Sequence, residues 1–152
     1  MGRVASRGFT LIEIAVVLLL LAVATAVVVP GVGRGADALR ARAEVAGFSA
    51  FLRHAREQAI TRREPHEVRV DPARGQMVLV LLAPDGPAVR GSKQFAVPLR
   101  IEADPPQAMT IRFSPQGVST GGLYRIEGPG RRVWEVAVDP VTGRVINRRI
   151  ES

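Results

Sequence analysis

Hydrophobic residues form one long run near the start of the chain, and charged residues lie on both sides of it. The run extends from Ile14 to Val29 and ends at Pro30. With the residues just before it, its length is close to the roughly 20 apolar residues that a helix needs to cross a bilayer core. The pattern predicts a transmembrane helix over residues 9–30, preceded by a short basic leader at residues 1–8.

Beyond Pro30 the hydrophobic pattern changes. The stretch from Gly31 to Gly35 is rich in glycine and predicts a flexible joint, because glycine has low helix propensity. Helical order is expected again from about Asp37 to Thr61, where apolar or small residues recur at alternating spacings of three and four. Joint and amphipathic helix together make up residues 31–61. The predicted apolar stripe consists of Ala38, Ala41, Val45, Phe48, Leu52, Ala55 and Ala59.

We expect this stripe to dock on a sheet of its own domain, and packing against neighbouring chains is the second interpretation. The β domain is predicted over residues 62–152, and from Glu67 onward the pattern changes to apolar residues at every second position, interrupted by turns. Two segments repeat the same order of strand, Asp-Pro turn closed by glycine, and strand. They are residues 68–82 with the turn 71–75, and residues 136–146 with the turn 139–143.

Proline presets the backbone for such a turn, and glycine accepts the positive φ at its end. Both segments are therefore predicted to be β-hairpins of a twisted antiparallel sheet. Further strands are expected at residues 109–113, 123–126 and 133–138. The predicted fold class is α+β: a long N-terminal transmembrane helix continues into an amphipathic helix that packs on an antiparallel β domain.

Composition narrows the chemistry. The 152 residues contain no cysteine, which excludes disulfides, thiolate metal sites and a cysteine nucleophile. The net charge is +7, and Lys93 is the only lysine, so arginine carries the cationic character. Arginine binds phosphate well, which keeps nucleic acid among the partners to consider. The arginines are scattered and aromatic residues are few, so we favour ordinary solvated cations.

One segment matches a catalytic pattern. Residues 117–121 read Gly-x-Ser-x-Gly, the nucleophile elbow of α/β hydrolases, which needs a histidine later in the chain. Both histidines, His54 and His66, precede Ser119, and two isolated imidazoles make no metal site. We expect His54 to be a surface helix residue and His66 to lie at a strand edge. The sequence therefore predicts no enzyme, no catalytic residues, no metal site and no cofactor.

A carboxylate at the edge of the apolar run points to a different role. An ionisable group in a bilayer costs on the order of 2.5–3.5 kcal/mol, so Glu13 should have a partner. If the chain were cut between Gly8 and Phe9, the new α-amino group would lie about one helical turn from Glu13, or opposite Glu13 of a neighbouring subunit. The leader, the cut and the carboxylate would then act together.

These residues resemble the N-terminus of type IV pilins and pseudopilins, and the resemblance covers the first thirty residues. It implies that a prepilin peptidase cuts after Gly8 and methylates Phe9, and that Glu13 directs subunit assembly. It also implies a single-pass protein of the bacterial inner membrane with its C-terminal domain in the periplasm. The matching residues are Gly8, Phe9, Thr10, Leu11, Ile12, Glu13 and Pro30.

Two other interpretations of this segment stay open. Arg3 and Arg7 followed by an apolar run also suit a secretory signal, with cleavage sites at Ala22-Val23-Ala24 or Ala24-Thr25-Ala26. A plain membrane anchor is the other, and flanking charges alone do not set its orientation.

The β domain carries a second resemblance. Residues 111–122, with Phe113, a Pro-x-Gly turn and Ser-Thr-Gly-Gly, resemble the GspH/FimT family of pilin-like proteins, as do residues 52–56 and 138–144. Gln116 stands where the family often has Asp.

The family includes GspH-type minor pseudopilins at the tip of the type II secretion pseudopilus, which supports export of folded proteins across the outer membrane. It also includes FimT-type minor type IV pilins, some of which bind DNA through a Gly-Arg-x-Arg tail. Here Ile146 replaces the second arginine of that tail.

We therefore favour type II secretion over pilus assembly or DNA uptake. The implied partners are other major and minor pseudopilins, the prepilin peptidase, the inner-membrane secretion platform and inner-membrane lipid. We expect nucleic acid to be at most a weak, nonspecific ligand of Arg144, Arg148 and Arg149.

Overall fold

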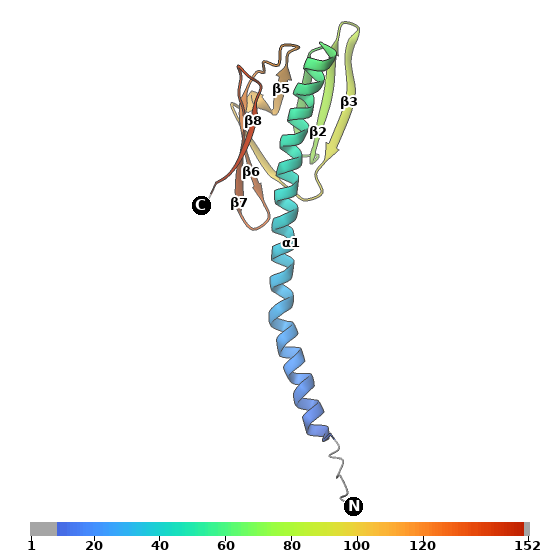
Figure 1. The fold of residues 1–152 in the computed structure, drawn as a ribbon, viewed down its shortest axis with the longest axis vertical. Coiled ribbons are helices and arrows are strands. Elements are labelled where there is room, and N and C mark those ends of the chain that lie inside the picture. Colours follow the sequence, from blue (N-terminus) through green and yellow to red (C-terminus); the bar gives the residue numbers. More distant parts are fainter. Residues whose placement is uncertain (1–8, 151–152) are drawn as a thin grey trace, which may run out of the picture. The chain divides into compact units, whose positions relative to one another are not determined.

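The computed structural model describes residues 9–150, except for the side chains of residues 27–35. The chain divides into two compact units, Met1–Ala36 and Asp37–Ser152. One long helix, α1 (Leu11–Arg62), contributes to both units. It is drawn in blue to green in Figure 1.

Helix α1 begins where the sequence places a capping residue. The Thr10 hydroxyl accepts a hydrogen bond from the backbone N–H of Glu13 at 3.3 Å, and the Thr10 carbonyl accepts from the same N–H at 3.1 Å. Thr10 followed three residues later by Glu13 is the pattern of a capping box, of which the threonine half is formed. The two motif residues therefore also define the start of the helix.

The helix is not interrupted after Pro30, contrary to the prediction. Helix α1 runs through residues 30–36, where the sequence predicted a loosened joint. Proline removes one hydrogen bond and its ring crowds the carbonyl four residues earlier, and glycine lowers helix propensity, but a long helix can accommodate both, as α1 does.

No helix among the described residues combines the length and the hydropathy needed to cross a bilayer. The transmembrane helix over residues 9–30 thus remains a prediction from the sequence.

The unit from Asp37 onward contains two four-stranded antiparallel sheets, where the sequence predicted one. The two predicted hairpins are confirmed: β1 (His66–Asp71) pairs with β2 (Gln76–Ala83), and β7 (Arg132–Val138) pairs with β8 (Val145–Ile150). The glycines that close both turns, Gly75 and Gly143, have φ of 63°.

The first sheet has the order β3 (Gly86–Gln94), β2, β1 and β5 (Thr110–Phe113). The second has the order β4 (Arg100–Asp104), β6 (Gly122–Gly128), β7 (Arg132–Val138) and β8 (Val145–Ile150), and a short 3-10 helix, η1 (Pro106–Met109), precedes β5.

Strands β3 and β4 were not predicted. Strand β3 contains two glycines and a proline, and most of its residues are exposed or half-buried, so its sequence resembles a loop. It pairs through its backbone with β2 on only one side, as an edge strand does.

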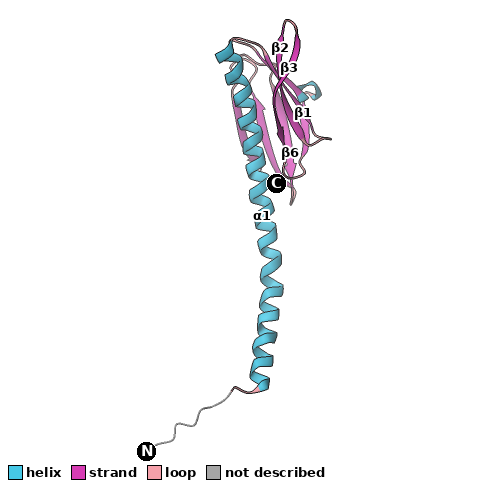
Figure 2. Cartoon of the chain, turned by 90° about the vertical axis from the view of Figure 1, so that its right-hand side faces the viewer, coloured by secondary structure: helices cyan, strands magenta, loops and turns pink. Residues whose placement is uncertain are grey.

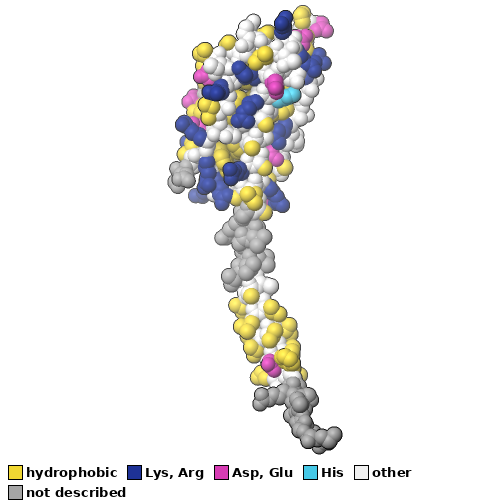
Figure 3. All heavy atoms as spheres, in the orientation of Figure 1, with side chains coloured by type: hydrophobic (Ala, Val, Ile, Leu, Met, Phe, Trp, Pro, Cys, Tyr) yellow, Lys and Arg dark blue, Asp and Glu magenta, His cyan; other side chains and the backbone are white. Residues whose placement is uncertain are grey.

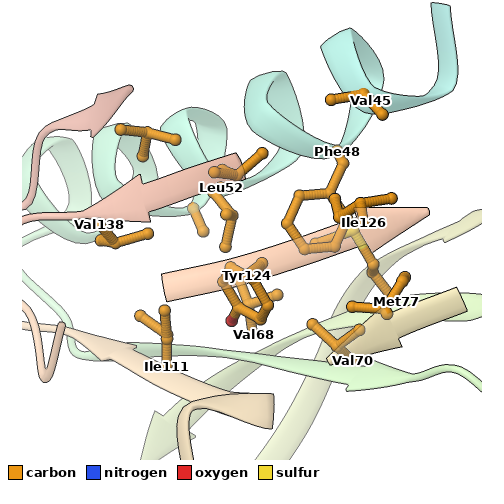
Figure 4. Close-up of a cluster of buried hydrophobic side chains, with 14 of the residues drawn as sticks. Val45, Phe48, Leu52, Val68, Val70, Met77, Ile111, Tyr124, Ile126 and Val138 are labelled. Carbon is orange, nitrogen blue, oxygen red and sulfur yellow. The ribbon is translucent and has the colours of Figure 1, made fainter. Parts of the chain in front are cut away.

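The predicted stripe of α1 docks on both sheets. All seven of its residues are buried, and the helix half that carries them lies against the two sheets in Figures 1 and 2. At the centre, Phe48 meets Tyr124 edge to face, with ring centroids 4.9 Å apart (Figure 4). The Tyr124 hydroxyl donates to the Ala108 carbonyl at 2.6 Å, and burial raises the pKa of this phenol. The stripe is therefore the main contact surface of the helix within its own domain.

Candidate functional site

The first candidate site is the start of the described chain. Phe9 is 76% exposed, and Glu13 lies in the first turn of α1. Gly8 lies outside the described residues, so the geometry of the predicted cut between Gly8 and Phe9 is not part of the structure. The predicted pairing of Glu13 with an α-amino group stays a prediction.

The apolar side chains that follow have no partner within the described chain. Leu11, Ile12 and Leu18 are 88%, 72% and 61% exposed, and the space-filling view shows hydrophobic side chains over the visible face of this part of α1 (Figure 3). Exposed apolar surface of this extent is found where a protein contacts a membrane or another protein. This part of the helix therefore has the composition of a binding surface.

The second candidate site is the loop with the Ser-Thr-Gly-Gly sequence. The Ser119 hydroxyl donates to the Asp139 carbonyl at 2.9 Å and accepts from the Gly121 N–H at 3.0 Å. The first bond holds the loop between β5 and β6 against the turn between β7 and β8, and the second closes that loop on itself. The hydroxyl that the hydrolase pattern singled out is thus engaged within the fold, and the Thr120 hydroxyl likewise accepts from the Arg112 N–H.

Asp139 fixes the neighbouring turn. Its carboxylate accepts from the Thr142 N–H at 2.7 Å, from the Thr142 hydroxyl at 2.9 Å and from the Val141 N–H at 3.0 Å. These bonds, first the one from the Thr142 backbone, lower the pKa of Asp139 below its ordinary value. The Asp-Pro turn is therefore closed by its own side chain, as Asx turns are.

Arg56 joins both loops to the helix. Its Nε lies 3.2 Å from the Gly117 carbonyl and 3.0 Å from the Thr142 carbonyl. The sequence placed Arg56 only as a residue off the apolar stripe, and its role was missed. A helix pattern shows which face a side chain occupies but not which loops reach it; the only available signal was the resemblance over residues 52–56.

A buried charge cluster was also missed. Glu67 on β1 is 1% exposed, and its carboxylate oxygens lie 2.6 Å from Arg69 Nε and 2.7 Å from Arg112 Nε. Burial opposes the ionisation of Glu67, but the hydrogen bonds and charges of the two arginines outweigh it and lower the pKa of this carboxyl. The cluster was missed because Arg112 comes from β5, far from Glu67 along the chain.

The two histidines lie in different environments. His54 is exposed on α1, as predicted. His66 opens β1 but is buried, with Nδ1 2.9 Å from the Glu64 carbonyl oxygen. Within residues 9–150 no group of three His, Cys, Asp or Glu side chains is arranged to hold a metal ion.

Of the three arginines of the predicted DNA tail, Arg148 and Arg149 line one groove and Arg144 lines another. Arg148 Nε donates to Glu135 across the β7–β8 pair at 2.6 Å. Arg149 pairs in register with Trp134, so it faces the opposite side of the sheet. Arg144 lines a separate groove of about 470 Å³ beside Arg53 and Arg56.

Comparison with known families gives two matches. Residues 44–142 match the family described as type II transport protein GspH, and residues 3–29 match the prokaryotic N-terminal methylation motif. The comparison with curated proteins gives no match.

Solved structures show the same fold. The minor pseudopilin EpsH from the type 2 secretion system of Vibrio cholerae is 18% identical with a TM-score of 0.61, covering 72% of this chain and 97% of that one. The type IV minor pilin FimU of Pseudomonas aeruginosa is 17% identical with a TM-score of 0.58, covering 79% of this chain and 96% of that one. At these identities the likeness establishes a pilin-like α+β fold and leaves function to other arguments.

Proposed function

This chain belongs to the type II transport protein GspH family, and we propose that it is a minor pseudopilin, a structural subunit at the tip of the type II secretion pseudopilus. Such a tip supports the export of folded proteins across the outer membrane. The observation that carries the proposal is the joint presence, in one chain, of the GspH match at residues 44–142 and the methylation motif at residues 3–29.

In this proposal the two ends of α1 have different tasks. The prepilin peptidase removes residues 1–8 and methylates Phe9, and the apolar segment 9–30 anchors the subunit in the inner membrane. Glu13 then pairs with a subunit amine in lipid, because an unpaired carboxylate there raises the free energy of the inserted helix. The unit from Asp37 onward lies in the periplasm and contacts other pseudopilins, while the inner-membrane platform drives the assembly.

Processing is tested by the intact mass of the membrane-extracted protein. We expect a mature terminus at N-methyl-Phe9, and we expect Gly8→Leu to block the cut. A terminus at Val27, as a signal peptidase would leave, or an uncut Met1 would contradict the pilin interpretation.

The role of Glu13 is tested by assembly. Glu13→Gln keeps the shape but removes the charge, so the subunit should still insert and should co-purify poorly with the other minor subunits. Glu57→Gln is the matched control, because Glu57 is an exposed carboxylate of the same helix and lies in the domain half. Equal co-purification of wild type and Glu13→Gln would count against the assembly role.

A FimT-like minor type IV pilin, acting in pilus assembly or DNA uptake, is the second candidate function. The likeness to FimU and the arginines near the C-terminus favour it. Because Arg144 lies apart from Arg148 and Arg149, and Arg148 pairs with Glu135, we expect only weak duplex binding at about 150 mM salt, falling steeply as salt rises. Micromolar or tighter binding that is lost in Arg144→Ala with Arg148→Ala would favour this second function.

A further inference from the structure

A groove of about 540 Å³ opens between residues 38–46 of α1 and the β7–β8 hairpin. Its apolar part comes from Ala38 and Val45 on the helix and from Trp134 on β7, which are 8%, 2% and 6% exposed. Leu39 also lines the groove and is 69% exposed. The groove therefore combines a packed apolar floor with an apolar side chain held in solvent.

Arginines surround this floor. Arg42 comes from α1, Arg132 from the start of β7 and Arg149 from β8, and all three are exposed. None of the three forms an ion pair with a described residue, whereas Arg148 beside them is neutralised by Glu135. Among the described residues, no acidic side chain lines the groove. Figure 3 shows Lys and Arg side chains gathered on this face with hydrophobic surface between them.

The combination fits an anionic amphiphile better than a nucleic acid. Arginine forks bind phosphate, and the exposed leucine beside them suits the boundary between headgroups and acyl chains. A nucleic acid would need an aromatic face for stacking or a continuous cationic track, and Trp134 is almost entirely covered.

The position along the chain points to the same ligand. Only seven residues lie between Pro30, the end of the proposed membrane segment, and Ala38 in the groove, so the chain between them can span at most about 29 Å. Headgroups extend roughly 5–8 Å beyond each side of the hydrocarbon core. Arg42 and its neighbours therefore belong to the part of the domain that covalent connection keeps nearest the lipid surface.

We propose that this arginine-lined groove binds the phosphate headgroups of anionic phospholipids in the outer leaflet of the inner membrane. This inference rests on the proposed membrane-anchored function and adds a second membrane contact to it. The contact holds the domain at the bilayer surface before the subunit joins the pseudopilus, and it must be released on assembly.

Trp134 provides a direct reporter because it is the only tryptophan of the chain and lines the groove. The full mature chain is placed in lipid discs of phosphatidylcholine alone or mixed with phosphatidylglycerol, each with a trace of headgroup spin-labelled lipid that quenches tryptophan. We expect quenching at least about threefold stronger in the anionic discs, decreasing with salt.

The test variant is the triple change Arg42→Gln, Arg132→Gln and Arg149→Gln, which should reduce quenching to the level of neutral discs. The matched control, Arg74→Gln with Arg90→Gln and Arg125→Gln, removes the same charge from exposed positions outside the groove and should keep the lipid dependence. Thermal unfolding of both variants checks that the fold is retained.

Equal quenching in both discs, or full quenching in the groove variant, would overturn the proposal. Loss of quenching on addition of duplex DNA at about 150 mM salt would also overturn it and assign the groove to nucleic acid. A chain that fails to stay in the disc would overturn the anchored function as well. A chain that stays but shows no lipid dependence would overturn only the groove assignment.

Discussion

The two halves of helix α1 use hydrophobic residues in opposite ways. Over residues 11–26 apolar side chains surround the helix, and every one of these residues is exposed. Over residues 38–59 seven apolar or small residues form one stripe that is buried against two sheets, while Leu39 lies off the stripe and is exposed. In the first half of α1 the apolar surface has no partner in the described chain. In the second half the apolar stripe is covered by the two sheets.

The two hydrophobic patterns call for different partners. A helix that is apolar on all sides cannot cover itself and needs lipid or other chains, whereas an amphipathic helix can be completed by its own domain. Substitutions in the second half should accordingly change the stability of the domain, and those in the first half should change only membrane insertion and assembly.

Removing the central aromatic residue should have the largest effect on this contrast. Phe48→Ala deletes a fully buried ring that contacts Tyr124 and Phe95, so the free energy of unfolding should fall by about 3–5 kcal/mol. Urea unfolding followed by Trp134 fluorescence measures it. Leu18→Ala is the control in the first half and should leave domain stability unchanged within about 0.5 kcal/mol. A comparable loss in both variants would show that the two halves are not independent.

Loss of the loop contacts of Arg56 should come next. Arg56→Ala leaves the Gly117 and Thr142 carbonyls without their donor and should cost about 1–3 kcal/mol. Arg53→Ala, one helical turn earlier on the exposed face, should cost less than about 0.5 kcal/mol. Equal stabilities would mean that water replaces the guanidinium and that the loops are held by Ser119 and Asp139 alone.

The half of α1 that meets the sheets was the more predictable half. Its stripe follows from side-chain period alone, and the two Asp-Pro hairpins follow from turn chemistry, so all three were predicted and confirmed. An element that buries one face in its own domain can be recognised in the sequence, because its apolar residues recur at the period of the helix or the strand.

What depends on distant contacts was not predictable. The split into two sheets is set by which strand edges meet, and edge strand β3 has too few apolar residues to be recognised. Arg56, Glu67 and the Trp134 groove each combine residues from elements far apart in sequence. The N-terminal motif was found by resemblance, and its assembly role stays a prediction because it depends on partners outside the chain.

The buried carboxylate should give the domain half an acid-sensitive component. The pKa of Glu67 is lowered in the folded state, so its stabilisation is complete above the unfolded value of about 4.5 and is lost as pH falls through the folded value. Glu67→Gln should lower stability by about 1–2 kcal/mol at pH 7 and flatten the acid limb.

Urea unfolding from pH 7 to pH 3 measures this dependence. Glu64→Gln, at an exposed position three residues earlier, should keep the wild-type profile. An unchanged acid limb in Glu67→Gln would assign the pH dependence to other carboxylates.

The smallest expected effect concerns the one glycine in the buried half of the helix. A Cβ at Gly47 would lie 2.8 Å from Lys93 Cε, and Lys93 Nζ pairs with Glu44 at 2.9 Å, while Glu44 also accepts from the Ala96 N–H at 3.2 Å. Gly47→Ala should gain about 1 kcal/mol of helix propensity and lose a similar amount by displacing Lys93.

Gly47→Ala alone should therefore leave stability within about 0.5 kcal/mol of wild type, since the two terms nearly cancel. In a Lys93→Ala background the steric term disappears, and the same change should stabilise the domain by about 1 kcal/mol. A double-mutant cycle of urea unfolding isolates this coupling. If Gly47→Ala stabilises equally in both backgrounds, the glycine makes no room for Lys93, and even this position of the buried half would behave like an ordinary exposed helix residue.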